Sequence, residues 1–354
     1  MREPSVSIVV PTIRRDIIGE FLDAWRDEFA GHRVIVMEDN PEPTFDLGDD
    51  SIVHLSWRDI DAELGEWSWI IPRRTDCVRS FGYLRAAQLG SDVIITLDDD
   101  CFPIEPGFIQ RHVRAVMGDA SEDAWVSTGT GVIPRGVPYQ ERSRKRRVGI
   151  NHGLWTNVAD YDAVTQLVLG RSGGQFEPIQ QTIPSGKQFP MCGMNLAWRA
   201  ELTPAMYFLL MGRDWPFDRF GDIWCGVFAK KICDHLGYAV TSGDPMIEHR
   251  RASNVWANLQ KEAPGLPVNE TLWASVDALV LTETTVGGCY AQIARELDVA
   301  GAYWDRLKDA MGFWAELATS AIESHRTDRA RDLLRSERCR IQPEQHLQPQ
   351  RLPA

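Results

Sequence analysis

The sequence predicts an α/β domain built on a mostly parallel β-sheet that is flanked by helices. Over residues 1–100, short runs rich in Val and Ile alternate with segments whose apolar residues recur at helical spacing. The apolar runs are continuous, which is typical of strands covered on both faces. The chain has 354 residues, 44% hydrophobic and 25% charged, so it is long enough to bury a core of its own.

Each expected element follows from this pattern. The first part of the chain is expected to form, in order, strand 6–10, helix 17–29, strand 34–37, strand 52–55, helix 77–89 and strand 92–97. The middle, residues 120–200, is poor in periodicity and rich in Gly, Pro and Arg, which favours long structured loops. Further helices are expected over 200–211, 222–236 and 301–336.

No repeat or linker divides the chain. We therefore expect one large domain over residues 1–300 and a helical extension over residues 301–338. Residues 339–354, where Gln and Pro are prominent, are expected to be a disordered tail.

Charge and cysteine content restrict the partners. A net charge of −12 argues against nucleic acid or an anionic membrane, which both need a basic face. No apolar run approaches the roughly 20 residues of a membrane span. The seven cysteines are scattered without a CxxC pair, and no signal peptide is apparent, so we expect a cytoplasmic protein without structural disulfides. A homo-oligomer is left open.

Three consecutive acids, Asp98, Asp99 and Asp100, directly follow strand 92–97. In a parallel sheet the strand ends meet at one edge, which would also bring Pro11, Thr12 and Asp39 there. Crowded carboxylates need compensation by a divalent cation or by basic side chains. We interpret the triplet as a site for metal and phosphate, because Mg²⁺ and Mn²⁺ prefer such ligands. The alternative is a helix cap with solvated acids.

The triplet and its surroundings resemble a known family. A strand leading into Asp-x-Asp is the signature of the GT-A glycosyltransferase fold, and residues 96–102 are similar to the reversibly glycosylated polypeptides of plants, the UDP-arabinopyranose mutases. Other stretches with this likeness are residues 9–14, 79–83, 152–155, 160–168, 189–197, 204–208 and 232–237. The resemblance implies a GT-A-like domain, a UDP-sugar substrate and Mn²⁺ or Mg²⁺ as cofactor.

The resemblance also suggests roles for individual residues. The metal ligands would be Asp98, Asp100 and His249, since GT-A enzymes often complete the metal shell with a late histidine. A hydrogen-bonded core histidine is the alternative for His249. The residues expected to bind the nucleotide or the diphosphate are Pro11, Thr12, Arg14, Asp39, Arg79, Asp98 and Asp99. For Arg14 and Arg79 a contact with the acids is equally expected, and Asp39 could instead cap its strand.

Two arginines carry the family's most distinctive segment. Residues 135–142 are similar to its Arg-Gly-x-Pro-aromatic-x-x-Arg run, which implies that Arg135 is reversibly glycosylated and that Arg142 is needed for activity. Arginine stays protonated near neutral pH and is a poor nucleophile. We therefore interpret both as groups that position the sugar and stabilise departing UDP. The basic run 142–147 has no counterpart in the family, and its residues 144–147 are expected to be a solvated loop.

The remaining candidates would surround the sugar. Asp222 opens a predicted helix, where it could cap the helix or serve catalysis; the family has two adjacent Asp residues where this chain has Gly221 and Asp222. Backbone amides at Gly193 could approach a pyranose. Asn195 is expected to bind a sugar hydroxyl, Trp155 to stack on the sugar or base, and His152 to approach the sugar.

Three functions are compatible with these residues. The first is a UDP-sugar mutase that interconverts the pyranose and furanose rings of a UDP-pentose. The second is a glycosyltransferase that moves the sugar to an arginine of its own or to a separate acceptor. The third is a non-catalytic partner subunit, against which the intact triplet and the two arginines argue.

Overall fold

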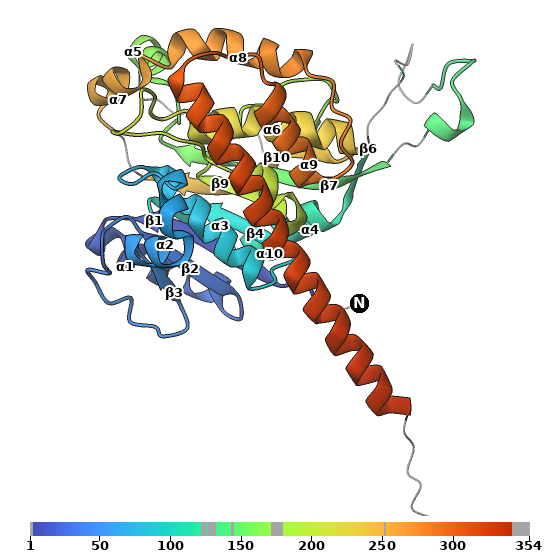
Figure 1. Ribbon diagram of the computed structural model, residues 1–354, viewed down its shortest axis with the longest axis horizontal. Helices are drawn as coiled ribbons and strands as arrows, with labels where there is room; N and C mark the ends of the chain where they lie inside the picture. Colours follow the sequence, from blue (N-terminus) through green and yellow to red (C-terminus); the bar gives the residue numbers. More distant parts are fainter. Residues whose placement is uncertain are drawn as a thin grey trace, which may run out of the picture.

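A sheet of ten strands runs through the middle of the protein, with helices on both faces (Figure 1). The computed structural model describes residues 3–121, 125, 132–142, 145–170, 180–250 and 253–341. The strands are β1 (Val6–Thr12), β2 (Arg33–Glu38), β3 (Val53–Leu55), β4 (Val93–Leu97), β5 (Cys101–Pro103), β6 (Asp119–Ser121), β7 (Lys145–Asn157), β8 (Gln181–Ile183), β9 (Asn195–Arg199) and β10 (Ala239–His249).

Ten α-helices and four short 3₁₀ helices are found in the described ranges. The α-helices are α1 (Arg15–Phe29), α2 (Trp57–Leu64), α3 (Arg79–Gln88), α4 (Phe108–Met117), α5 (Ala163–Leu169), α6 (Gly221–Leu236), α7 (Val255–Glu262), α8 (Leu266–Ala278), α9 (Val286–Glu296) and α10 (Ala302–Ile341). The 3₁₀ helices are η1 (Gly65–Ile70), η2 (Asp76–Val78), η3 (Tyr139–Glu141) and η4 (Ala200–Ala205). None of these helices is long and apolar enough to cross a bilayer.

The sheet is mostly parallel, as predicted. Its order is β3-β2-β1-β4-β9-β7-β10-β5, and β1 pairs in parallel with both β2 and β4. Strand β9 is antiparallel to its neighbours β4 and β7, while β7 and β10 run parallel to each other. As a result, β1, β2, β4, β7 and β10 all point the same way, and their carboxyl ends lie at one edge of the sheet.

Side chains that alternate along the strands belong to two hydrophobic cores, one on each face of the sheet. In β1, Val9 belongs to the larger core with α3, α6, α9 and α10, whereas Ile8 and Val10 belong to the core beneath α1 and α4. Helix α1 buries the stripe that its spacing predicts, with Trp25 stacked on Phe29 at 5.5 Å between ring centroids. Both faces of the sheet are therefore covered, which explains why its strands are continuously apolar.

Helix α10 belongs to the main core over its first half. It packs against α9, α3 and η4, and it buries Leu307, Met311 and Trp314, the last stacked on Tyr207 at 5.2 Å. Figure 1 shows the second half extending past the body of the protein. The helix expected over 301–336 is thus confirmed and continues to Ile341. The tail expected from residue 339 lies, from residue 342 on, outside the described residues.

Two expectations for secondary structure are wrong. The helix predicted over 200–211 is only the short η4, which contains Pro204, and the chain then continues without helix through the fully buried residues Met206 to Met211. A run that is apolar at every position fits a buried extended segment as well as a helix. The supposedly loop-rich middle contains β7, a strand of 13 residues. Polar residues inside that strand interrupt its apolar pattern, so the sequence did not predict it.

A buried histidine joins α4 to the sheet. His112 is 0% exposed; its Nε2 lies 2.8 Å from Asn195 Oδ1, and its Nδ1 lies 3.0 Å from the amide nitrogen of Asn151. The two amides therefore bind a neutral ring, which donates from Nε2 and accepts at Nδ1. Burial lowers the pKa of His112 from 6.5 to about 3.

This burial makes stability depend on pH. Between pH 6.5 and about 3 the unfolded chain binds a proton at His112 and the folded chain does not, so acidification lowers the free energy of unfolding. From pH 7.5 to 5.5 we expect His112 to contribute a loss of about 1 kcal/mol. Urea denaturation of His112→Gln should show a correspondingly smaller loss over this range. The exposed His235→Gln is the control, and an unchanged pH dependence in His112→Gln would contradict the assignment.

Candidate functional site

The site predicted at the carboxyl edge of the sheet is centred between β1 and β4. The chain leaves β1 for β2 and β3 on one side and returns to β4 on the other, so the order of the strands reverses here, and open α/β sheets bind ligands at such a point. Asp98 follows β4 at this point, and Thr12 ends β1. The backbone of Asp39, just after β2, donates to the carbonyl of Thr12 at 2.8 Å. The ends of β1 and β2 are thereby held together.

Two arginines compensate the acidic triplet. Arg14 donates to Asp99 Oδ2 at 3.1 Å and to Asp100 Oδ2 at 3.2 Å, while Thr12 Oγ1 donates to Asp99 at 2.6 Å. Arg79 is 2% exposed and pairs with Asp98. The contacts with acids expected for both arginines are therefore present. Asp99 is only 1% exposed and binds Thr12 and Arg14, so it holds the β1 loop and does not face a nucleotide.

Asp100 and His249 face each other across the end of β10. His249 Nε2 lies 3.9 Å from Asp100 Oδ1, and Nδ1 lies 3.0 Å from the carbonyl of Val158. Because a carbonyl only accepts, a neutral ring carries its proton on Nδ1 and turns the Nε2 lone pair towards the carboxylate. Burial and the neighbouring Asp98 raise the pKa of Asp100. The Asp100 carboxylate and His249 Nε2 are two acceptors that face each other next to the negative charge of Asp98, and this arrangement suits a cation.

A complete metal cage is absent from the described residues, where no group of three or more His, Cys, Asp or Glu could hold a metal ion. This does not support the expected ligands Asp98, Asp100 and His249 as a complete site. A hard cation such as Mg²⁺ or Mn²⁺ can bind one or two carboxylates and complete its shell with water and substrate phosphates. The donors available for such an ion are Asp100, His249 and the part of Asp98 that Arg79 does not engage.

Asp39 organises the loop after η1. Its Oδ1 accepts from the indole of Trp57 at 2.7 Å and from the backbone of Arg74 at 2.9 Å, and burial raises its pKa. Asp39 therefore links β2, α2 and the loop at residues 71–75. Its carboxylate lies at the edge where a nucleoside was expected, but Oδ1 is already used within the protein.

A turn at residues 191–193 joins the triplet to α6. Arg79 Nη1 donates to the carbonyl of Gly193 at 2.7 Å, and the Gly193 amide donates to Asp222 Oδ2 at 2.8 Å. A Cβ at Gly193 would lie 2.7 Å from the ring of Phe208, so only glycine fits without displacement. Asp222 Oδ1 accepts from the amide of Ile223, but α6 begins at Gly221 with Phe220 at its N-cap, so the predicted cap role of Asp222 is wrong.

Asp222 has the properties of an acid–base group. Burial raises its pKa to about 7, assisted by the carboxylates of Asp76 and Asp160. Asp160 accepts from the thiol of Cys192 at 3.0 Å, on the same turn that Asp222 binds. Asp76, Asp160 and Cys192 were not among the sequence candidates. Asp160 and Cys192 fall inside stretches that resemble the family, which was the available signal.

Two expected sugar contacts lie inside the protein. Asn195 is 0% exposed, and its amide is used by His112, the carbonyl of Leu154 and the carbonyl of Pro245. It therefore supports the strands and does not offer a group to a sugar hydroxyl, contrary to expectation. His152 is 5% exposed, is bonded to Ser242 Oγ and sits edge-on to the rings of Trp155 and Phe189. Burial lowers the pKa of His152 to about 4.

Two other candidates, Trp155 and Pro11, lie near the carboxyl edge of the sheet. Trp155 is half-buried in β7, where it pairs with Ile247 of β10. Pro11 is half-buried in β1, directly before the Thr12 that holds Asp99.

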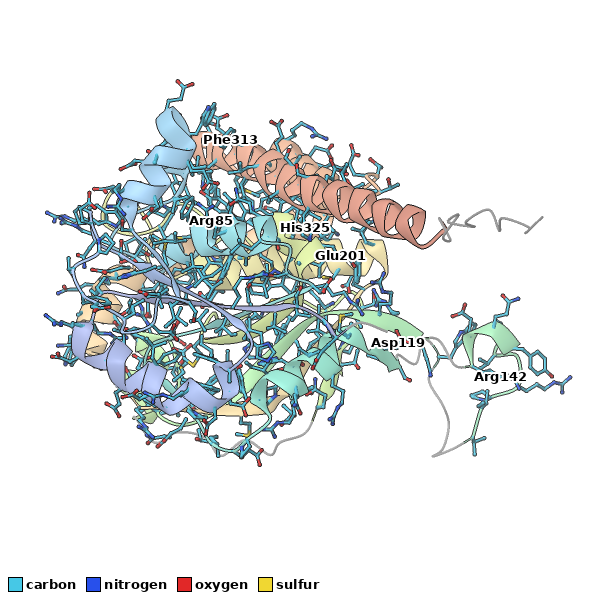
Figure 2. The ribbon with its side chains drawn as sticks, turned by 90° about the horizontal axis from the view of Figure 1, so that it is seen from below. Arg85, Asp119, Arg142, Glu201, Phe313 and His325 are labelled. Atoms are coloured by element: carbon cyan, nitrogen blue, oxygen red, sulfur yellow. The ribbon has the colours of Figure 1, made fainter. Side chains whose placement is uncertain are left out.

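The arginine segment lies at the opposite edge of the sheet. Arg142 precedes β7, whereas the triplet is level with the later part of that strand near Leu154. The strand between Lys145 and Leu154 spans roughly 30 Å. Figure 2 shows Arg142 away from the body, beyond Asp119 of β6. The structure thus does not bring Arg135 or Arg142 to the triplet of the same chain, contrary to expectation. Residues 145–147 of the basic run begin β7, where they pair with β6 and Arg146 is buried, so the expectation of a solvated loop is wrong for them. Residues 143–144 lie outside the described residues.

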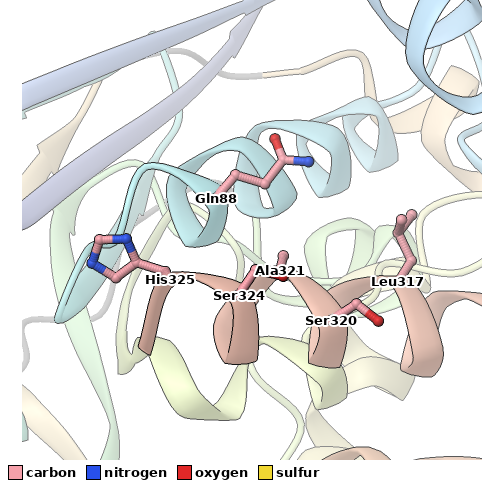
Figure 3. Close-up of a pocket in the computed structure, with 6 residues that line it drawn as sticks. All are labelled: Gln88, Leu317, Ser320, Ala321, Ser324 and His325. Carbon is pink, nitrogen blue, oxygen red and sulfur yellow. The ribbon is translucent and has the colours of Figure 1, made fainter. Parts of the chain in front are cut away.

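One cavity does not belong to this site. It lies between the end of α3 and α10, with a volume of about 360 Å³, and is lined by Gln88, Leu317, Ser320, Ala321, Ser324 and His325 (Figure 3). Helix α3 begins at Arg79, beside the triplet, and Gln88 is roughly 14 Å further along it. The lining of this cavity contains no acidic group and no residue of the triplet.

Comparison with known proteins agrees with this geometry. The family described as "Reversibly glycosylated polypeptide" matches residues 1–322. The chain belongs to the reversibly glycosylated polypeptide family. The match includes every strand and every helix except the end of α10, so the triplet, the 191–193 turn and Asp222 all lie within it.

Curated members of the reversibly glycosylated polypeptide family are similar along most of this chain. "Probable UDP-arabinopyranose mutase 1" of Pisum sativum is 35% identical over 333 residues, covering 88% of this chain and 89% of its own. "UDP-arabinopyranose mutase 1" of Arabidopsis thaliana is 34% identical and covers 88% and 91%. The protein of that name from Oryza sativa subsp. japonica is 33% identical and covers 90% and 93%.

Packing around Gly193 yields a test of the site. We expect Gly193→Ala to lower the free energy of unfolding by about 1–3 kcal/mol, because the methyl group meets Phe208 and crowds Arg79. Gly19→Ala, in α1 with nothing within 4 Å, is the matched control and should be neutral or stabilising by up to about 1 kcal/mol. Urea denaturation measures both. Equal effects would show that the turn is not tightly packed.

Proposed function

We propose that this protein is a UDP-sugar mutase that interconverts the pyranose and furanose forms of a UDP-pentose, UDP-arabinopyranose and UDP-arabinofuranose. The observation that carries the proposal is the linked set Asp98–Arg79–Gly193–Asp222 at the carboxyl edge of the sheet, in a chain whose curated relatives are named UDP-arabinopyranose mutases. Nucleotide sugars bind at this edge in open α/β sheets.

The ring exchange needs a departing UDP and a mobile proton. In the proposed reaction the bond from C1 to the phosphate oxygen breaks and UDP leaves with the electron pair. The 4-hydroxyl then replaces the 5-oxygen at C1, and UDP returns to C1. One proton passes from O4 to O5, so a single group can accept and return it. Asp222, with a pKa of about 7, is suited to both steps.

The rest of the site serves the diphosphate. We propose Mn²⁺ or Mg²⁺ as the cofactor, with Asp100 and His249 as the protein groups that would hold it, where it would neutralise the charge of the leaving group. Arg14 and Arg79 keep the three carboxylates together in the absence of substrate. The turn at Gly193 places a carbonyl and an amide between Arg79 and Asp222, next to the expected position of the sugar.

Transfer of the sugar to Arg135 of the same chain is the second candidate function. The position of Arg142 at the opposite edge, roughly 30 Å along β7, argues against it.

We further propose a cytoplasmic location, since the six described cysteines other than Cys339 are free thiols.

Activity can be tested directly. The purified protein with UDP-arabinopyranose and MnCl₂ should produce UDP-arabinofuranose, resolved by anion-exchange chromatography, at a rate that falls as the pH drops through about 7 and Asp222 becomes protonated. Asp222→Asn should lower the rate by about 100-fold or more, and exposed Asp305→Asn should not. Release of UDP with a pentose adduct on the protein would favour the transferase, and no turnover would overturn both functions.

The metal can be tested by calorimetry. UDP should bind at least about tenfold more weakly in EDTA than in MnCl₂, because a cation would bridge the triplet and the diphosphate. Asp100→Asn and His249→Gln should each remove most of this metal-dependent gain, while Asp305→Asn should keep it. An affinity for UDP that is the same with and without the metal would remove the cation from the site.

A further inference from the structure

A second cavity, which no residue of the triplet lines, lies near Asp39. Its volume is about 450 Å³, and three segments surround it: the loop at Arg74, the loop at residues 212–218 and the end of α7 with the residues after it. The residues that determine its character are Arg74, Arg213, Trp215, Phe217, Asp218 and Lys261. None of them was a candidate from the sequence, and the proposed mutase reaction does not use them.

The backbone holds two of these loops against each other. Arg74 has a left-handed backbone with φ of 59°, and its amide donates to Asp39 Oδ1 at 2.9 Å. A Cβ at Gly212, where φ is 96°, would lie 3.1 Å from the side chain of Thr75. The loop carrying Arg74 and the loop carrying Arg213 are therefore in contact. Through Asp39, the cavity borders the end of β2 and the predicted nucleotide site.

The charges of the cavity are only partly balanced. Lys261 Nζ pairs with Asp218 Oδ2 at 3.1 Å, so these two groups largely neutralise each other. Within the described ranges, the guanidinium of Arg213 has no ion pair or hydrogen bond, and that of Arg74 has only the ring of Trp57, 5.9 Å from its centroid. Both arginines are exposed to solvent, so two guanidinium groups without a counter-ion line one open pocket at the surface of a protein whose net charge is −12.

One wall of the cavity is aromatic and rigid. Phe217 packs edge-on against Trp224 and Tyr303 at 5.4 and 4.8 Å between centroids, and Trp215 contacts Tyr303 at 6.3 Å. These rings are anchored to α6 and α10, so the wall is formed before any ligand binds. A cavity with a cationic side and an apolar side matches a small molecule that carries an anionic group on an organic body.

We propose that this cavity binds a phosphate group, with Arg74 and Arg213 as its ligands, at a position separate from the diphosphate of the nucleotide sugar. Guanidinium groups bind phosphate oxygens through paired, charge-assisted hydrogen bonds, which explains the use of two arginines here. The phosphate could be free or part of a phosphomonoester, and the aromatic wall predicts that a phosphomonoester binds more tightly. The proposal goes beyond the mutase reaction and does not depend on turnover.

The test uses inorganic phosphate and ribose 5-phosphate as probes, titrated by calorimetry into the full-length protein saturated with UDP and MnCl₂. Both probes should bind, with ribose 5-phosphate the tighter. Arg213→Ala and Arg213→Glu should weaken binding by about tenfold or more, and Arg213→Lys should restore part of it. Exposed Arg26→Ala, on α1, is the control and should bind like wild type. Thermal melts verify that each variant is folded.

Each result decides the proposal separately from the mutase function. Binding that requires Arg213 in the presence of UDP supports a second phosphate site. Binding seen only in the absence of UDP would assign the anion to the diphosphate position and overturn the proposal. The absence of binding, or an affinity that Arg213→Ala and Arg213→Glu leave unchanged, would also overturn it. UDP affinity, measured for the same proteins, reports on the proposed function alone.

Discussion

Burial of the Arg79 guanidinium beneath the acidic triplet is the contact on which the site depends. Three carboxylates at the end of a buried strand repel one another and lose hydration. Arg79 pairs with Asp98 and also donates to the side chain of Thr96 and the carbonyl of Gly193. A buried arginine left without these partners would be strongly destabilising. The same requirement therefore fixes the ends of β4 and β9 relative to α3.

The remaining site groups follow from this arrangement. With the Gly193 carbonyl bound by Arg79, the Gly193 amide points to Asp222, which is half-buried and whose pKa rises to about 7. Arg14 binds Asp99 and Asp100 from the other side and orders the loop after β1. Asp100 is left facing His249 across a gap that suits a cation. Charge compensation thus produces both the acid–base group and the proposed metal position.

Long-range pairing explains why some sequence expectations were wrong. Asn195 follows a small-residue turn and looks available for a sugar, but β9 lies between β4 and β7, so its amide is enclosed by His112 and two carbonyls. Arg142 lies in the family's arginine segment, yet the direction of β7 carries that segment to the far edge. Asp160 could not be identified from spacing, because its link to Cys192 joins residues 32 positions apart.

Local pattern in the sequence was sufficient for β1, β2, β3 and β4, for α1, α3, α6 and most of α10, and for the position of the triplet at a strand end. Periodicity and chain order carry that information, because they reflect burial of each element on its own. The tertiary structure alone decided which carboxylates are paired with arginines and which take a raised pKa. Those properties depend on desolvation and on charges contributed by distant segments, and no local pattern encodes the distances between them.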